Sequence, residues 1–165
     1  MSPRAVCAAV PSSLQVQGTC VALDGVGVLL RGPSGAGKSD LALRLIDGGA
    51  VLVADDLCQI RRESESLFID LPDQVDPIFR GQIEIRGFGI ARLDYFGPAP
   101  LGLVVDLRPV RQAGRSSGPA AIEYLGLARP LVVLDPFQAS AATRLRLMAA
   151  SRLDQDRIGS LRTDP

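Results

Sequence analysis

The segment Gly32-Pro33-Ser34-Gly35-Ala36-Gly37-Lys38-Ser39 holds the residues whose types and spacing are best suited to chemistry. It fits the pattern G-x-x-x-x-G-K-[ST] without a mismatch, and this pattern is typical of loops that bind nucleotide phosphates. Glycines let backbone N–H groups point at an anion, and the helix that follows such a loop adds partial positive charge. Lys38 can reach the β- and γ-phosphates, and the Ser39 hydroxyl can ligate Mg²⁺. The segment therefore predicts a site for ATP and Mg²⁺.

The flanking residues predict the strand and the helix that must position this loop. Before it, residues 26–30 are almost continuously apolar, which indicates a buried strand. After it, apolar residues recur at helical spacing over residues 40–47, and Gly48-Gly49 is a suitable end for a helix. Residues 16–23 predict one further strand, which the turn signal Asp24-Gly25 joins to the loop strand as a hairpin.

Two carboxylates form a second candidate feature. The run Val53-Ala54-Asp55-Asp56 places them at the end of an apolar strand, and nucleotide sites lie at that edge of such sheets. Phosphoryl transfer uses carboxylates to complete the Mg²⁺ shell and to orient or deprotonate the attacking hydroxyl. Adjacent residues on a strand point to opposite faces, so both can serve one site only if the chain turns there. A solvated Asp-Asp turn is the alternative, and the neighbouring phosphate-loop pattern favours the functional interpretation.

A third feature is the run Gln82-Ile83-Glu84-Ile85-Arg86-Gly87-Phe88-Gly89-Ile90. It predicts a strand over residues 83–90 with Glu84 and Arg86 on one face. Glu84 could ligate or order a metal, and Arg86 could neutralise phosphate oxygens in the transition state. From the spacing alone, a surface ion pair on an edge strand is an equally good interpretation.

The other patterns predict more strands than helices. Strands are expected over residues 51–54, 101–107 and 131–134, with two more inside 59–69, and a helix over 139–153. Few helices argue against a purely alternating strand–helix layout. The predicted fold class is α/β, a nucleotide-binding domain with a mixed sheet around the phosphate loop. We expect a single domain over residues 1–165, with a flexible tail from about residue 154 to 165.

Composition narrows the function further. The chain has 165 residues, enough for one domain with a core, and 18 basic side chains balance 18 acidic ones. With zero net charge, the chain has no overall positive charge to attract a nucleic acid, which argues against that class of partner. No apolar run is long enough to span a bilayer. Three scattered cysteines lack metal spacing, which suits a cytoplasmic protein. Histidine is absent, so no step can use imidazole.

The runs GPSGAGKS, LVADD and EIRGFGI together resemble the catalytic domain of the HPr kinase/phosphorylase family over about residues 15–110. That family phosphorylates a serine of HPr, the phosphocarrier protein of the bacterial sugar phosphotransferase system. Its fold is similar to the nucleotide domain of phosphoenolpyruvate carboxykinase. The chain resembles the short form that is typical of alphaproteobacteria. The resemblance implies a protein-serine kinase that uses ATP and Mg²⁺, with an HPr-like protein as partner and a homo-oligomeric assembly.

The resemblance also implies roles for particular residues. The nucleotide phosphates would be held by Gly32, Pro33, Ser34, Gly35, Ala36, Gly37, Lys38 and Ser39. Asp55 would be the general base toward the substrate serine and the acid in the reverse reaction, with Lys38 and Arg86 as further catalytic residues. The metal would be bound by Ser39, Asp56 and Glu84.

Two segments depart from the family pattern. Gln17 occupies the aligned position of a family histidine, and glutamine can hydrogen-bond but cannot carry a positive charge near neutral pH. This departure argues against the reverse phosphorolysis. The run Asp135-Pro136-Phe137-Gln138-Ala139-Ser140 stands where the long family form has a glycine- and arginine-containing loop. We interpret it as a candidate for substrate docking or assembly.

Two other function classes stay open. Gln17 would also suit a nucleotide-sensing regulatory module with little transfer activity. The phosphate loop alone would suit a small-molecule kinase or an NTPase, although Arg61, Arg62 and Arg111 are not arranged as substrate arginines. A GTPase is disfavoured because no N-K-x-D segment is present.

Overall fold

The phosphate loop lies between a central strand and a short helix. The computed structural model describes residues 11–109 and 120–160, with side chains described as far as residue 151. Strand β3 (Val26–Arg31) leads into the loop, and helix α1 (Lys38–Asp47) follows it, as the sequence predicts. α1 begins at Lys38 rather than at residue 40. Its end is closed by the N–H groups of Gly48 and Gly49, which donate to the carbonyls of Leu45 and Ile46.

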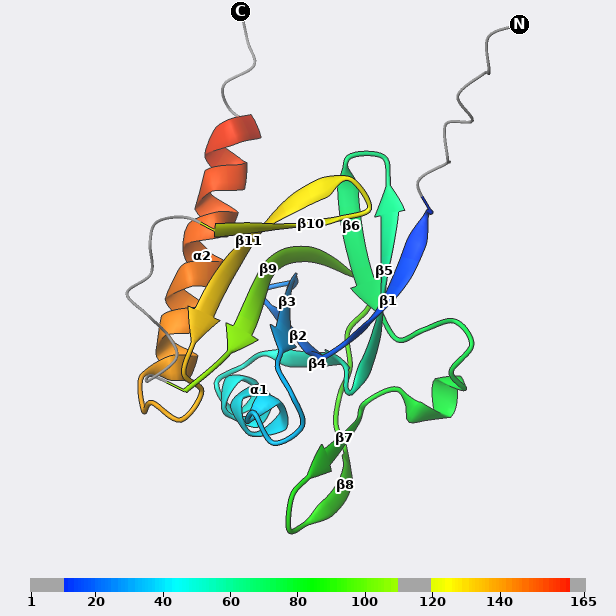
Figure 1. Ribbon diagram of the computed structural model, residues 1–165, viewed down its shortest axis with the longest axis vertical. Helices are drawn as coiled ribbons and strands as arrows, with labels where there is room; N and C mark the ends of the chain where they lie inside the picture. Colours follow the sequence, from blue (N-terminus) through cyan, green and yellow to red (C-terminus); the bar gives the residue numbers. More distant parts are fainter. Residues whose placement is uncertain (1–10, 110–119, 161–165) are drawn as a thin grey trace, which may run out of the picture.

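The strands form a nine-stranded mixed sheet and a separate two-stranded hairpin. The large sheet has the order β1-β5-β6-β9-β3-β2-β4, with β11 beside β9 and β10 beside β11. β3 is parallel to β9 and antiparallel to β2, so the predicted hairpin at Asp24-Gly25 is confirmed. The sheet curls, and the β7–β8 hairpin projects away from it (Figure 1). The remaining strands are β1 (Ser13–Gln17), β2 (Thr19–Leu23), β4 (Val51–Ala54), β5 (Leu57–Glu63), β6 (Ser66–Asp70), β7 (Gln82–Ile85), β8 (Gly89–Arg92), β9 (Ala99–Leu107), β10 (Ala120–Tyr124) and β11 (Leu127–Leu134).

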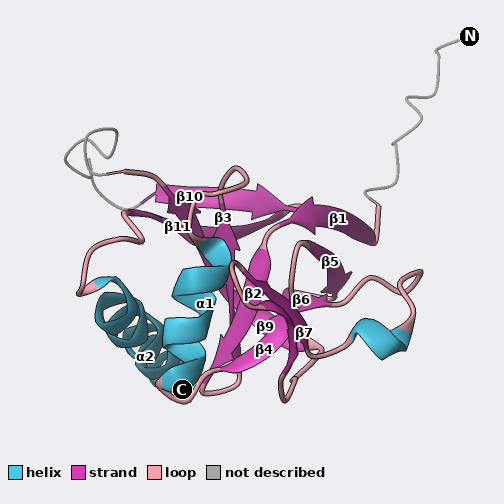
Figure 2. Ribbon diagram, turned by 90° about the horizontal axis from the view of Figure 1, so that it is seen from below, coloured by secondary structure: helices cyan, strands magenta, loops and turns pink. Residues whose placement is uncertain are grey.

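Central strands are buried on both faces, which explains their continuous apolar runs. On β3, Val28 and Leu30 join a core that also holds the apolar faces of both helices. Leu29 points to the other face, into a second core made by the curled part of the sheet. Helix α1 and helix α2 (Ala141–Ser160) therefore cover one face only (Figure 2). This packing fixes the start of α1, and with it the phosphate loop, against the end of β3.

Two predicted strands are each divided in the structure. The prediction of one strand over residues 16–23 is wrong, because the chain breaks at Gly18 into β1 and β2. A Cβ on Gly18 would lie 2.7 Å from the carbonyl oxygen of Leu30. Only glycine therefore fits where the chain between β1 and β2 passes so close to β3. The prediction of one strand over residues 83–90 is also wrong, because this segment forms the hairpin β7–β8, with Gly87 at φ 81° in the turn and Gly89 at φ 111° at the start of β8.

The C-terminal half contains further differences from the prediction. Strand β10 was not predicted, and it pairs with β11, which begins at Leu127 rather than at residue 131. α2 continues to Ser160, so it includes the first part of the predicted tail, and residues 161–165 lie outside the described residues. A short 3-10 helix, η1 (Pro77–Phe79), precedes β7. None of the described helices has the length and apolarity needed to cross a membrane.

The packing of α1 gives a testable expectation. Leu45 is fully buried in the core between the helices and the sheet, whereas Leu147 on α2 is exposed. We expect Leu45→Ala to lower the free energy of unfolding by about 2–5 kcal/mol, since a cavity remains in the core. Leu147→Ala should change it by less than about 0.5 kcal/mol. Urea unfolding measures both, and equal losses would contradict this description of the core.

Candidate active site

The phosphate loop has the geometry of an anion site. Gly35 and Gly37 adopt φ angles of 81° and 93°, which few other residues adopt without strain. Gly37 precedes the first turn of α1, and no described side chain caps that turn. The backbone N–H groups of this first turn are therefore available to phosphate oxygens. The Lys38 Nζ donates to the carbonyls of Gly32 and Pro33 at 2.9 and 3.1 Å, which keeps its charge inside the loop.

A pocket of about 480 Å³ opens beside the loop, and we call it the carboxylate pocket. It brings together most of the predicted catalytic and metal residues, although they come from different segments. Its walls contain Lys38, Ser39, Asp56, Glu84 and Arg86. Of the predicted loop residues, Ser34, Gly35 and Gly37 also line it.

Asp55 is the predicted base that does not line this pocket. Its Oδ1 accepts a hydrogen bond from the Thr19 hydroxyl at 2.7 Å, and its Oδ2 accepts from the Glu84 N–H at 3.2 Å. Burial raises the pKa of Asp55 above its ordinary value, and these two hydrogen bonds oppose the rise without cancelling it. Asp55 therefore connects β2, the end of β4 and the β7–β8 hairpin.

Asp56 has a different environment from its neighbour. β4 ends at Ala54, and Asp56 adopts a φ of 62°, so the chain turns at the carboxylate pair. The Asp56 carbonyl accepts a hydrogen bond from the Gly18 N–H at 3.1 Å, which fixes the turn against the β1–β2 crossing. Its side chain is exposed and lines the carboxylate pocket. Of the two adjacent carboxylates, Asp56 is thus the one that faces the phosphate loop.

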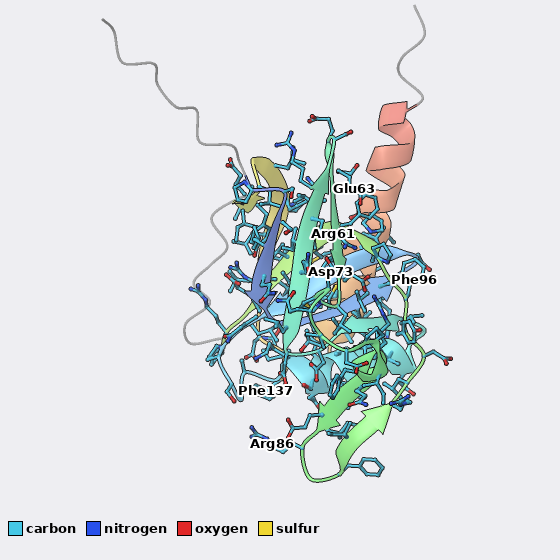
Figure 3. All side chains as sticks on the ribbon, turned by 90° about the vertical axis from the view of Figure 1, so that its right-hand side faces the viewer. Arg61, Glu63, Asp73, Arg86, Phe96 and Phe137 are labelled. Carbon is cyan, nitrogen blue, oxygen red and sulfur yellow. The ribbon has the colours of Figure 1, made fainter. Side chains whose placement is uncertain are left out.

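Glu84 and Arg86 reach the pocket from the β7–β8 hairpin. Glu84 lies on β7, but Arg86 lies in the turn, so the prediction that one strand face presents both is wrong. They still line the same pocket. A Cβ built on Gly35 would lie 3.9 Å from a terminal nitrogen of Arg86, which places the guanidinium against the phosphate loop. Figure 3 shows Arg86 and Phe137 on the same side of the molecule, and both line this pocket.

The base of the hairpin is anchored at both ends. On the incoming side, Arg80 donates to both oxygens of the buried Asp70 at 2.7 and 3.1 Å. On the outgoing side, the Phe96 N–H donates to the Leu52 carbonyl on β4 at 2.8 Å. Glu84 and Arg86 are therefore carried by a hairpin that is fixed to the sheet, although its tip is exposed.

The oxygen ligands in the carboxylate pocket fit Mg²⁺. Among the described residues, no group of three or more His, Cys, Asp or Glu side chains is arranged as a metal cluster. The pocket instead offers the Ser39 hydroxyl with the carboxylates of Asp56 and Glu84. Mg²⁺ is commonly bound by one or two carboxylates together with substrate phosphates and water, so such a partial shell is suitable.

Several residues near the loop were not assigned roles by the sequence. Thr19, the partner of Asp55, gives no motif signal. A second pocket of about 700 Å³ beside the loop is lined by Arg31, Asp106 and Arg108, and also by Phe137, which belongs to the run interpreted from the sequence as a candidate for docking or assembly. Arg31 is the last residue of β3, Asp106 lies near the end of β9, and the other two residues follow β9 and β11. Strand ends are the signal that could have found them. Gln17 lies opposite Leu57 in the β1–β5 pair, next to the carboxylate turn, and does not line either pocket.

Comparison with known proteins agrees with this arrangement. Residues 9–100 match the family described as the HPr Serine kinase C-terminal domain. The chain belongs to this family. The matched range includes β1 through β8 and therefore every residue that lines the carboxylate pocket except Phe137.

Individual members of the HPr serine kinase family show how far the similarity extends. The HPr kinase/phosphorylase of Leptospira biflexa serovar Patoc is 47% identical over 81 residues, which cover 48% of this chain and 24% of that protein. The one from Chlorobium limicola is 40% identical over 114 residues, covering 68% of this chain and 34% of that protein. The chain thus spans about a quarter to a third of the length of these curated relatives.

A solved structure supports the fold of this family member. The Hpr(Ser) kinase/phosphatase from Coxiella burnetii superposes with a TM-score of 0.76, covering 92% of this chain and 99% of that chain. The two sequences are 21% identical, so this likeness concerns the fold. The mixed α/β architecture with its curled sheet is therefore that of the family's C-terminal domain.

The buried position of Asp55 gives an expectation for stability. Burial raises the pKa of this carboxyl above its usual value of 3.8, so its ionisation costs stability as the pH rises above that value. In Asp55→Asn the amide oxygen can accept from the Glu84 N–H, and the Thr19 hydroxyl can turn to accept from the amide NH₂. We expect this variant to unfold at higher urea concentration than the parent chain at pH 7, with the difference shrinking toward pH 4. A destabilised variant at pH 7, or a difference independent of pH, would contradict this.

Proposed function

We propose that this chain is an ATP- and Mg²⁺-dependent protein-serine kinase whose acceptor is a serine of an HPr-like phosphocarrier protein. One observation carries the proposal. The carboxylate pocket joins the phosphate-loop residues Lys38 and Ser39 to Asp56, Glu84 and Arg86. These are the group types that position a triphosphate and its metal, receive a proton and neutralise developing charge. Membership of the HPr serine kinase family supports the same assignment.

When bound, ATP would supply the transferred phosphoryl group and Mg²⁺ would neutralise part of its charge. The N–H groups of the loop and the Lys38 ammonium would hold the phosphates in line with the acceptor hydroxyl. Ser39 and Glu84 would hold the metal. Arg86, which lies against the loop at Gly35, would stabilise the charge that develops on the phosphoryl oxygens.

We assign the role of proton acceptor to Asp56 and a positioning role to Asp55. The sequence predicts Asp55 as the base and Asp56 as a metal ligand, so this assignment leaves the metal to Ser39 and Glu84. Two observations support the exchange: Asp56 lines the pocket, and both oxygens of Asp55 already accept hydrogen bonds from Thr19 and Glu84. A base must reach the proton that it removes, so accessibility to the pocket decides between the two.

Exposed apolar side chains on the β7–β8 hairpin support a protein as the acceptor. Phe88 and Ile90 on the β7–β8 hairpin are 78% and 71% exposed, and they lie two and four residues after Arg86 in the chain. Such surfaces commonly mark protein interaction sites. The relatives named HPr kinase/phosphorylase support HPr as that protein. Other exposed apolar residues, from η1 and the segment after β8, are Ile78, Phe79 and Tyr95.

Gln17 favours a second candidate, a nucleotide-sensing module with little transfer activity. Its side chain is exposed beside the carboxylate turn, and glutamine cannot supply the proton or the positive charge of the family histidine. A sensing module would bind the nucleotide at the same site as the proposed kinase, but it would form no phosphoserine on HPr. For the same reason we leave the reverse phosphorolysis out of the leading proposal.

Transfer from γ-labelled ATP with Mg²⁺ to HPr of the same organism tests the proposal. We expect label on an HPr serine, at a rate reduced at least about 100-fold in both Lys38→Ala and Asp56→Asn. Asp47→Asn is the matched control, because Asp47 is an exposed carboxylate at the end of α1 and lies outside both pockets. It should transfer at the parental rate.

The same assay separates the alternatives. Asp55→Asn should retain more activity than Asp56→Asn if Asp55 only positions the hairpin. The opposite ranking would return the role of base to Asp55. ATP binding without any label on HPr would favour the sensing module, and ATP turnover that is independent of HPr would favour a small-molecule kinase or NTPase.

A further inference from the structure

The second pocket lies on the opposite flank of the phosphate loop from the catalytic carboxylates. In the sheet, β3 has β2 and β4 on one side and β9 and β11 on the other. The carboxylate turn follows β4, whereas the second pocket is built at the ends of β3 and β9 and from the segments that follow β9 and β11. Residues 32–36 line it, so the loop is a wall of this pocket as well. A ligand extended across the loop would therefore have one end in each pocket.

Phe137 lies between the two pockets and lines both. A Cβ on Gly37 would lie 3.3 Å from the ring atom Cζ, so the ring tip touches the phosphate loop. The rest of the side chain is open, with 67% of the residue surface exposed. The turn that carries it is fixed, since the Phe137 N–H donates to Asp135 Oδ1 at 3.0 Å and the Arg44 guanidinium donates to the Pro136 carbonyl. The fold thus holds an exposed aromatic face beside the loop.

The polar residues of the second pocket are mostly paired with one another. Arg31 forms an ion pair with Asp106 at 2.8 Å and donates to the Tyr124 hydroxyl at 2.8 Å. These contacts neutralise the Asp106 carboxylate, which would otherwise repel a phosphate chain. Arg108 is half-exposed and lies 3.8 Å from Asp106, so its guanidinium can turn toward a ligand. The pocket therefore offers an aromatic face and hydrogen-bond donors without excess negative charge.

We propose that this second pocket binds the nucleoside end of the triphosphate, with a purine base stacked on Phe137 and Arg108 contacting the ribose or the α-phosphate. The proposal rests on the proposed function, because the γ-phosphate end must lie at Asp56 and Glu84. With that end fixed, the nucleoside extends over the loop toward β9 and β11. The volume of about 700 Å³ is ample for a nucleoside. An aromatic side chain provides the flat face on which bases stack.

Binding of MgATP compared with magnesium tripolyphosphate tests this assignment by calorimetry. Tripolyphosphate carries the phosphate chain without a nucleoside. We expect the parent chain to bind MgATP more tightly than the tripolyphosphate. Phe137→Ala should weaken MgATP at least about 5-fold and leave tripolyphosphate within about 2-fold. Leu147→Ala, which removes an exposed apolar side chain on α2, should change neither affinity.

A tryptophan probe gives a second measurement. The chain contains no tryptophan, so Phe137→Trp introduces a single indole at the proposed stacking position. MgATP should quench its emission, and magnesium tripolyphosphate should not. Equal quenching by both ligands, or equal weakening of both by Phe137→Ala, would overturn the stacking assignment. Equal parental affinity for both would overturn the nucleoside site while leaving the phosphate site intact. A parent chain that binds neither would instead overturn the proposed function.

Discussion

The geometry of the site depends on the two hydrogen bonds that the Asp55 carboxylate accepts. One oxygen accepts from Thr19 on β2 and the other from the Glu84 N–H on β7. A single side chain thus fixes the end of β4 relative to both the central sheet and the projecting hairpin. The hairpin is also held by Ile83, which is buried in the core shared with α1, and at its base by the Arg80–Asp70 pair and the hydrogen bond between Phe96 and Leu52. Burial of the charge costs stability. We propose that the benefit of this cost is the placement of Glu84 in the carboxylate pocket.

The loop separates two regions of different charge. The carboxylates of Asp56 and Glu84 lie on the side of β4, where a metal can compensate them. The guanidinium groups of Arg31 and Arg108 lie on the side of β9, where no metal is needed to attract a phosphate chain. Lys38 contributes its charge between them. In the proposed orientation, the γ-phosphate needs the metal in order to lie beside the carboxylates, whereas the α-phosphate can lie beside Arg108 without one.

Local patterns predicted the central part of the molecule well. The loop between β3 and α1 follows from glycine placement and apolar spacing, which are properties of adjacent residues. Long-range contacts were not accessible in the same way. The break at Gly18 depends on the carbonyl of Leu30, and the different environments of the two aspartates depend on Thr19 and on a backbone N–H of β7. Phe137 shows the same limit, since only the folded chain brings it to Gly37.

The most direct test is a crystal structure of the chain with Mg²⁺ and a non-hydrolysable ATP analogue. We expect the metal to contact the Ser39 hydroxyl, with the γ-phosphate facing Asp56 and Asp55 still accepting from Thr19 and the Glu84 N–H. A structure in which Asp55 leaves these partners and turns toward the γ-phosphate, while Asp56 points into solvent, would contradict the division of roles between the two carboxylates.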